Sequence, residues 1–120
     1  MRKEKKWVGL KYLTKEKDKM EQKRASGWSV DLLAIRSWVT ALKRGQVGDN
    51  TRHEDRVRAI RGELREFERA TVEASEHLPG FTEQQEELAD IILVCLTSLC
   101  ELKTDVGDLL DQKIKFNNVR

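Results

Sequence analysis

The chain has 120 residues, 38% hydrophobic and 37% charged, which suits a single helical domain with a moderate core and excludes a second domain. Its net charge is only +2, but residues 1–24 hold ten Lys or Arg against four Asp or Glu, so the excess of basic charge lies there. Two cysteines exclude a disulfide framework and a Cys-rich zinc site. The longest strongly apolar run, residues 91–100, is too short to span a membrane. We expect a soluble, cytoplasmic protein with no membrane partner.

The basic charge defines an N-terminal arm over residues 1–27, which precedes a helical domain over residues 28–120. The first helix of this domain is predicted over residues 29–44. Ser29 is a suitable N-cap, and the apolar residues that follow recur at helical spacing. Gly45 stops this helix and begins a loop.

The second helix is predicted over residues 54–77, because apolar or small residues step by three or four from Val57 to Leu78. Pro79 and Gly80 then break the chain.

The third helix is predicted over residues 82–102, with Thr82 as its cap. From Leu88 onward it is apolar almost all round, so other helices must surround it, and we expect the protein to oligomerise around it. A fourth helix is predicted from Asp105 to the C-terminus. Because no β-hairpin or βαβ signal is present, the predicted class is all-α, a four-helix bundle that forms a homodimer or a dimer of dimers.

Four acidic residues form two pairs on the second and third helices. Glu63 and Glu66 are three residues apart, so they project from one side of a helix about 60° apart. Glu87 and Asp90 repeat this spacing next to the apolar run. A carboxylate beside a buried helix is costly unless it is paired or binds a metal, and Mg²⁺ takes oxygen ligands. The pattern indicates a magnesium site, the alternative being two solvated helix faces.

The last helix carries Lys113, Asn117 and Arg120 at positions i, i+4 and i+7. Lys and Arg supply positive charge and Asn a directed hydrogen bond, as a polyphosphate groove requires. The alternative is a basic last turn that favourably opposes the helix dipole.

Together these segments resemble the MazG-type nucleotide pyrophosphohydrolases of the all-α NTP pyrophosphatase superfamily. That family carries an EExxE helix, an ExxD helix and a final helix with Lys, Asn and often Arg. The matching segments here are IRGELREFERA (60–70), EELADIILVCLTSL (86–99) and DVGDLLDQKIKFNNVR (105–120). The resemblance covers about residues 29–120 and leaves out the basic arm.

The resemblance implies Mg²⁺-dependent hydrolysis of (d)NTPs to (d)NMP and pyrophosphate, a house-cleaning of nucleotide pools, with Mn²⁺ as an alternative ion. The implied metal ligands are the four paired acids, Glu63, Glu66, Glu87 and Asp90. The implied phosphate-binding residues are those of the last helix, Lys113, Asn117 and Arg120. Glu66 would also accept the proton of the attacking water.

Two positions depart from the family pattern, since Gly62 replaces the first acid of EExxE and Arg65 stands where the family favours a small residue. Arg65 is therefore expected to pair with a neighbouring acid. The family's first helix often covers the nucleobase with aromatic residues, which makes Trp38 and Trp28 candidates for stacking on the base. The alternative is that Trp38 is a core residue.

Other functions stay open. A phosphoribosyl-ATP pyrophosphohydrolase shares the fold and the metal chemistry, so only the substrate distinguishes it. A non-catalytic nucleic-acid-associated module would use the basic arm on phosphate backbones, but it leaves the acids beside a buried helix unexplained, so nucleic acid is not the expected partner. A non-catalytic bundle would bind Mg²⁺ without turnover.

Overall fold

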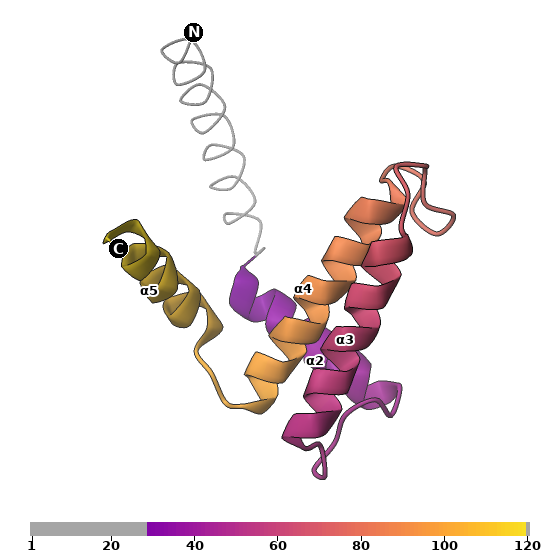
Figure 1. Cartoon of the computed structure of the whole chain (residues 1–120). Helices are drawn as coiled ribbons and strands as arrows, with labels where there is room; N and C mark the ends of the chain where they lie inside the picture. The colour runs from indigo at the N-terminus through magenta and orange to yellow at the C-terminus, as the bar shows by residue number, and fades with distance from the viewer. Residues whose placement is uncertain (1–28, 120) are drawn as a thin grey trace, which may run out of the picture.

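The computed structural model describes residues 29–119 of the chain (Figure 1). These residues form four helices, which are α2 (Val30–Lys43), α3 (His53–Arg69), α4 (Glu83–Glu101) and α5 (Val106–Val119). The described part has no strand, only an isolated antiparallel bridge between Ala74 and Thr82. The prediction of an all-α class with four helices is confirmed. The basic arm, Trp28 and Arg120 lie outside the described residues.

Capping side chains explain where three of the helices begin. The Ser29 hydroxyl accepts a hydrogen bond from the amide of Leu32 at the start of α2. Thr82 and Gln85 form a reciprocal capping box at the start of α4, with bonds of 3.1 and 2.9 Å. The carboxylate of Asp105 accepts from the amide of Asp108 before α5. The predicted starts of these helices are therefore confirmed to within one residue.

The predicted continuation of the second helix to residue 77 is wrong, because α3 ends at Arg69 and Ala70 is extended (φ −68°, ψ 142°). The following loop is tied to the first turn of α4 by two hydroxyl groups. Thr71 Oγ1 donates to the Glu83 carboxylate at 3.0 Å, and Ser75 Oγ donates to Glu86. Ser and Thr hydroxyls that bond locally compete with helix formation, which outweighs the helical spacing of the apolar residues in this stretch.

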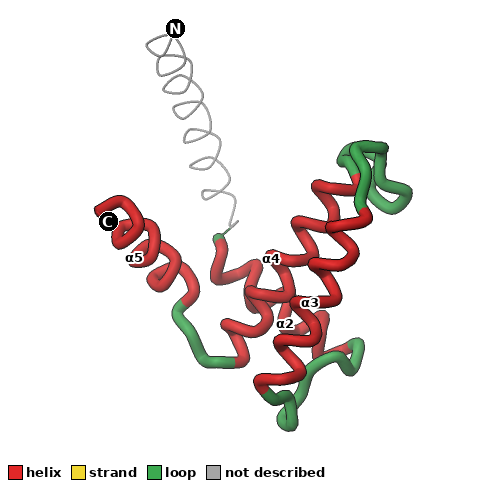
Figure 2. Tube along the Cα trace, viewed as in Figure 1, coloured by secondary structure: helices red, strands yellow, loops and turns green. Residues whose placement is uncertain are grey.

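Helix α4 is the central element of the fold (Figures 1 and 2). Both α2 and α3 pack against it, and α5 packs against α2 and α4. Within the described part of the chain, α2 and α3 do not pack against each other, and α5 does not pack against α3. A small buried cluster of Ala34, Leu96 and Val106 joins α2, α4 and α5.

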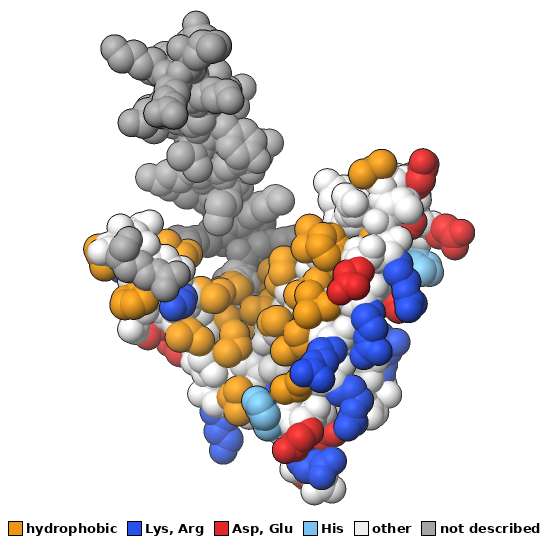
Figure 3. Space-filling model, viewed as in Figure 1, with side chains coloured by type: hydrophobic (Ala, Val, Ile, Leu, Met, Phe, Trp, Pro, Cys, Tyr) orange, Lys and Arg blue, Asp and Glu red, His pale blue; other side chains and the backbone are white. Residues whose placement is uncertain are grey.

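One side of α4 is exposed instead of being surrounded by other helices. Leu88 is 45% exposed and Ile92 is 58% exposed. Figure 3 shows hydrophobic side chains gathered over α4 and toward α5. A single copy of residues 29–119 therefore leaves part of the apolar helix uncovered. No helix in this range is both long and apolar enough to cross a membrane.

Candidate functional site

Three of the four predicted metal ligands meet where α3 packs on α4. Glu63 comes from α3, and Glu87 and Asp90 come from α4, and one oxygen of each carboxylate lies within 4.8 Å of the others. All three residues are half-buried. The two helices therefore bring together acids that are far apart in the sequence, as the spacing predicted.

The pKa values of the three clustered carboxyl groups are raised, which means that their ionised forms are less stable here than in water. Burial raises the pKa of Glu63, and the charges of Asp90 and Glu66 raise it further. The pKa of Glu87 is raised for the same reasons, first by burial and then by Asp90 and Glu63. Burial is also the main cause of the raised pKa of Asp90, followed by the charge of Glu86. Bringing these like charges together favours the protonated forms unless a cation compensates them.

Glu66, the fourth predicted ligand, lies at the rim of this cluster. Its side chain is exposed, and it does not belong to the close group of three carboxylates. Its charge nevertheless contributes to the raised pKa of both Glu63 and Glu87, so it lies near them.

The donor chemistry of the cluster fits a hard divalent cation. All of its side-chain donors are carboxylate oxygens, which Mg²⁺ and Ca²⁺ prefer, and no sulfur or imidazole belongs to it. A divalent cation would also offset the mutual repulsion that raises the three pKa values.

A cavity of about 1010 Å³ extends from this cluster along α4. It exists because α2 and α3 both pack on α4 and not on each other. Glu63 and Asp90 line it, and so do Arg36 of α2 and Arg44, which follows the last residue of α2. The charge of Arg44 lowers the pKa of Asp90, although burial outweighs this effect. The cavity lining therefore combines carboxylates with guanidinium groups.

Hydroxyl groups join α2 to α4 along this cavity. Ser37 Oγ lies 2.8 Å from Thr97 Oγ1 and donates to the carbonyl of Leu93 at 3.0 Å. Both hydroxyl residues line the cavity. Sequence reasoning did not find these residues or the two arginines, because Arg36, Ser37 and Arg44 lie on the polar side of an amphipathic helix, which is normally assigned to solvent.

The two predicted phosphate-binding residues that the structure describes are not brought to the acids within one chain. Lys113 and Asn117 are exposed on α5, which lies away from α3 (Figure 1). The ammonium group of Lys113 lies over the ring of Phe116, 4.8 Å from its centroid. Arg120 lies outside the described residues.

The tryptophan predicted to stack on a base is not part of the cavity wall. Trp38 is half-buried on α2 and does not line the cavity, and Trp28 lies outside the described residues. Arg65 does not pair with an acid among residues 29–119 as expected; its Nε donates to the carbonyl of Arg61 at 3.4 Å. A Cβ added at Gly62 would meet no atom within 4 Å, so space does not require glycine there.

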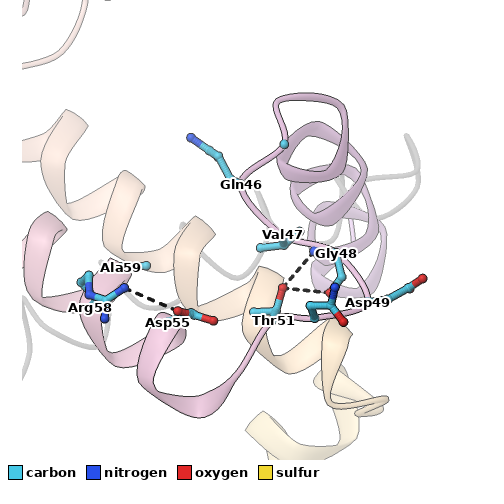
Figure 4. A pocket seen from close by; sticks show the side chains of 10 residues that line it. Gln46, Val47, Gly48, Asp49, Thr51, Asp55, Arg58 and Ala59 are labelled. Atoms are coloured by element: carbon cyan, nitrogen blue, oxygen red, sulfur yellow. Dashed lines mark hydrogen bonds and ion pairs between the residues drawn. The ribbon is translucent and has the colours of Figure 1, made fainter.

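A second, smaller hollow of about 540 Å³ lies between the α2–α3 loop and the start of α3 (Figure 4). Its polar groups largely bond to one another. Thr51 Oγ1 donates to the Gly48 carbonyl and accepts from the Gly48 amide, and Arg58 bonds to Asp55 at 3.5 Å. None of the four predicted metal ligands lines this hollow. We therefore place the candidate site in the larger cavity.

Comparisons with protein families, with curated proteins and with solved structures found no match for this chain.

Proposed function

We propose that the chain is a Mg²⁺-dependent nucleotide pyrophosphohydrolase, which converts a nucleoside triphosphate to the monophosphate and pyrophosphate. The observation that carries this proposal is the meeting of Glu63, Glu87 and Asp90 beside a cavity that is lined by Glu63 and Asp90 and also by Arg36 and Arg44. An acidic group that can bind a metal, together with guanidinium groups, is complementary to a metal–polyphosphate complex. The proposal agrees with the family resemblance of the sequence.

Each group has a separate role in this proposal. Glu63, Glu87 and Asp90 would hold Mg²⁺, with Glu66 as an outer ligand. The ion, when bound, neutralises phosphate charge and lowers the pKa of a coordinated water. Glu66 accepts the proton as the water oxygen bonds to the α-phosphorus and pyrophosphate leaves.

Arg36 and Arg44, which line the same cavity, bind phosphate oxygens. Their position in the same chain supplies positive charge that α5 does not bring to the acids. Guanidinium groups suit this role because their planar donors match phosphate geometry and remain charged at any physiological pH.

We propose further that the enzyme is a cytoplasmic homodimer or dimer of dimers, assembled through the exposed side of α4. Leu88 and Ile92 supply the apolar surface for this contact. In such an assembly, Lys113, Asn117 and Arg120 of one copy would be available to the acids of another. This arrangement gives the last helix a role that a single copy does not provide.

The test is pyrophosphate release from a panel of ordinary and modified (d)NTPs and phosphoribosyl-ATP, with and without Mg²⁺. We expect Mg²⁺-dependent release from at least one nucleoside triphosphate, lowered at least 100-fold in Asp90→Asn. Glu68→Gln is the matched control, because it neutralises an exposed acid on α3 outside the cavity. Release from phosphoribosyl-ATP alone would assign the alternative substrate. No release from any compound, with the protein folded, would refute the proposal.

A further inference from the structure

The cavity is also lined by an ion pair, Arg56 and Glu101, that has no role in the proposed hydrolysis. Arg56 lies near the start of α3, and Glu101 is the last residue of α4. Arg56 Nε lies 3.5 Å from Glu101 Oε1, and the two side chains are 17% and 8% exposed. This pair is therefore largely removed from solvent, unlike the ion pairs of Asp55 and Asp111.

The pair is held by charge without a hydrogen bond. Neither Arg56 Nε nor Glu101 Oε1 has a hydrogen-bond partner among residues 29–119, although both atoms are buried. The two atoms are 3.5 Å apart, but their contact does not have hydrogen-bond geometry. A buried donor and a buried acceptor without partners are destabilising. The other polar atoms of the guanidinium and the carboxylate are not fully buried, and both residues line the cavity, so these atoms can bond to a group that enters it.

The pair lies at a suitable distance from the carboxylate cluster. Arg56 and Glu101 line the same cavity as Glu63 and Asp90. Arg56 precedes Glu63 by two helical turns, which is about 10 Å at 1.5 Å per residue, and Glu101 follows Asp90 by eleven residues, about 16 Å along α4. A nucleotide spans distances of this order from its phosphates to the far edge of its base. A nucleotide with its phosphates at the acids therefore reaches Arg56 and Glu101 with its base.

We infer that Arg56 and Glu101 form the base-recognition site of this cavity, an inference that rests on the proposed function. The Glu101 carboxylate accepts a hydrogen bond from an N–H of the base, and the Arg56 guanidinium donates to a neighbouring ring nitrogen or carbonyl oxygen. The ligand class is a nucleotide whose base presents a donor next to an acceptor on one edge. Sites that hydrogen-bond a ligand group discriminate strongly against analogues without it, because their buried polar atoms are then left unpaired.

Binding of nucleoside monophosphates tests this inference without depending on turnover. CMP, UMP, AMP, GMP and ribose 5-phosphate are titrated into the full chain by calorimetry in buffer containing Mg²⁺. At least one monophosphate is expected to bind ten times or more tighter than ribose 5-phosphate, which has no base. Glu101→Gln is expected to lower the ratio of the affinity for that monophosphate to the affinity for ribose 5-phosphate toward one, and to leave the affinity for ribose 5-phosphate unchanged. Asp111→Asn, which removes an acid from an exposed ion pair on α5, is expected to keep the ratio.

A purely structural pair predicts a different result. If Arg56 and Glu101 only join α3 to α4, Glu101→Gln lowers the thermal midpoint and leaves the affinity ratio unchanged. The exchange variant Arg56→Glu/Glu101→Arg would then restore the midpoint, and its ratio would equal that of the wild type. For a recognition site, the exchange restores the midpoint without restoring the ratio.

The two proposals fail separately. Hydrolysis of triphosphates with an unchanged ratio in Glu101→Gln overturns the base-recognition site and leaves the proposed function standing. A base-dependent affinity that requires Glu101, without hydrolysis of any triphosphate, supports the site and overturns the proposed function. No preference of the wild type for any monophosphate over ribose 5-phosphate overturns the base-recognition site.

Discussion

The hydroxyl oxygens of Ser37 on α2 and Thr97 on α4 lie 2.8 Å apart, in a contact that is the polar part of an otherwise apolar helix interface. Thr97 is 7% exposed, so its hydroxyl has little access to water. The Ser37 hydroxyl also donates to the carbonyl of Leu93, which ties the side chain of α2 to two groups of α4. This contact positions α2 along the cavity that holds the candidate site.

Removing this hydroxyl should destabilise the fold. Ser37→Ala leaves the Thr97 hydroxyl without its partner, and the expected loss in free energy of unfolding is about 1–2 kcal/mol. Urea denaturation measures it. The control is Thr40→Ala. Among residues 29–119 the Thr40 hydroxyl bonds only to the Arg36 carbonyl of its own helix, so the loss in free energy of unfolding should be clearly smaller. Equal losses in the two variants would contradict the role assigned to the Ser37–Thr97 contact.

The carboxylate cluster should make the stability dependent on pH. The folded chain binds protons at Glu63 and Asp90 more tightly than the unfolded chain, since both pKa values are raised from 4.5 and 3.8. Their destabilising effect is therefore complete above the raised values, weakens as the pH falls through them, and vanishes below the ordinary values.

The Glu63→Gln/Asp90→Asn variant isolates this effect in metal-free buffer. At pH 7 it should be more stable than the wild type, by about 1 kcal/mol or less because the groups are partly exposed to solvent. The difference should shrink as the pH is lowered toward 4. Denaturation of both proteins across this range measures it, and a difference that grows on acidification would count against the assigned cause.

Magnesium should raise the thermal midpoint by binding only the folded cluster. When the concentration of Mg²⁺ is one hundred times its dissociation constant, the free energy of unfolding rises by about 2.7 kcal/mol. Differential scanning fluorimetry should show a raised midpoint in the wild type and in Glu68→Gln, but not in Asp90→Asn. Removal of the ion with EDTA should return the midpoint to its metal-free value. An equal response of wild type and Asp90→Asn would place the ion elsewhere.

The glycine within α3 offers a change that should stabilise the protein. Gly62→Ala should add about 0.5–1 kcal/mol, because glycine is unfavourable inside a helix and a Cβ at this position meets no atom within 4 Å. Gly62→Glu should raise the free energy of unfolding by less than Gly62→Ala in metal-free buffer, because it places another negative charge next to Glu63. Chemical denaturation of both variants with and without Mg²⁺ measures this. The stability of Gly62→Glu should respond more strongly to the ion than that of Gly62→Ala.

The exposed side of α4 predicts self-association. Ile92→Glu, at a side chain that is 58% exposed, should shift the protein toward the monomer in sedimentation velocity. Val72→Glu is the control, because Val72 is 72% exposed and lies in the loop after α3, not in α4. A wild type that is monomeric at high concentration would contradict the predicted dimer.

The starts of α2 and α4 were predictable from the sequence, because they depend on hydrogen bonds between residues that are close in the chain. Ser29 and Thr82 cap their helices through bonds to residues three positions later, which are readable from the chain itself. The meeting of Glu63 with Glu87 and Asp90 was also predictable, because each pair lies on one side of its helix and the two helices follow one another in the chain.

The sequence did not predict features that depend on distant contacts. The end of α3 depends on bonds from Thr71 and Ser75 to the first turn of α4, which compete with a periodic pattern that favoured more helix. The role of Arg36 at the cavity follows from a separation between α2 and α3 that no local pattern encodes. The position of α5, and with it that of Lys113, likewise depends on packing.

Because α2 and α3 each pack on α4 and not on each other, two independent interfaces fix the width of the cavity. Ala34 lies in the α2–α4 interface and is only 1% exposed, so a larger side chain there would force α2 away from α4. Such a change would move the guanidinium groups relative to the carboxylates without altering any residue that lines the cavity. Evolution can therefore adapt this fold to ligands of different size by substitutions in its core alone.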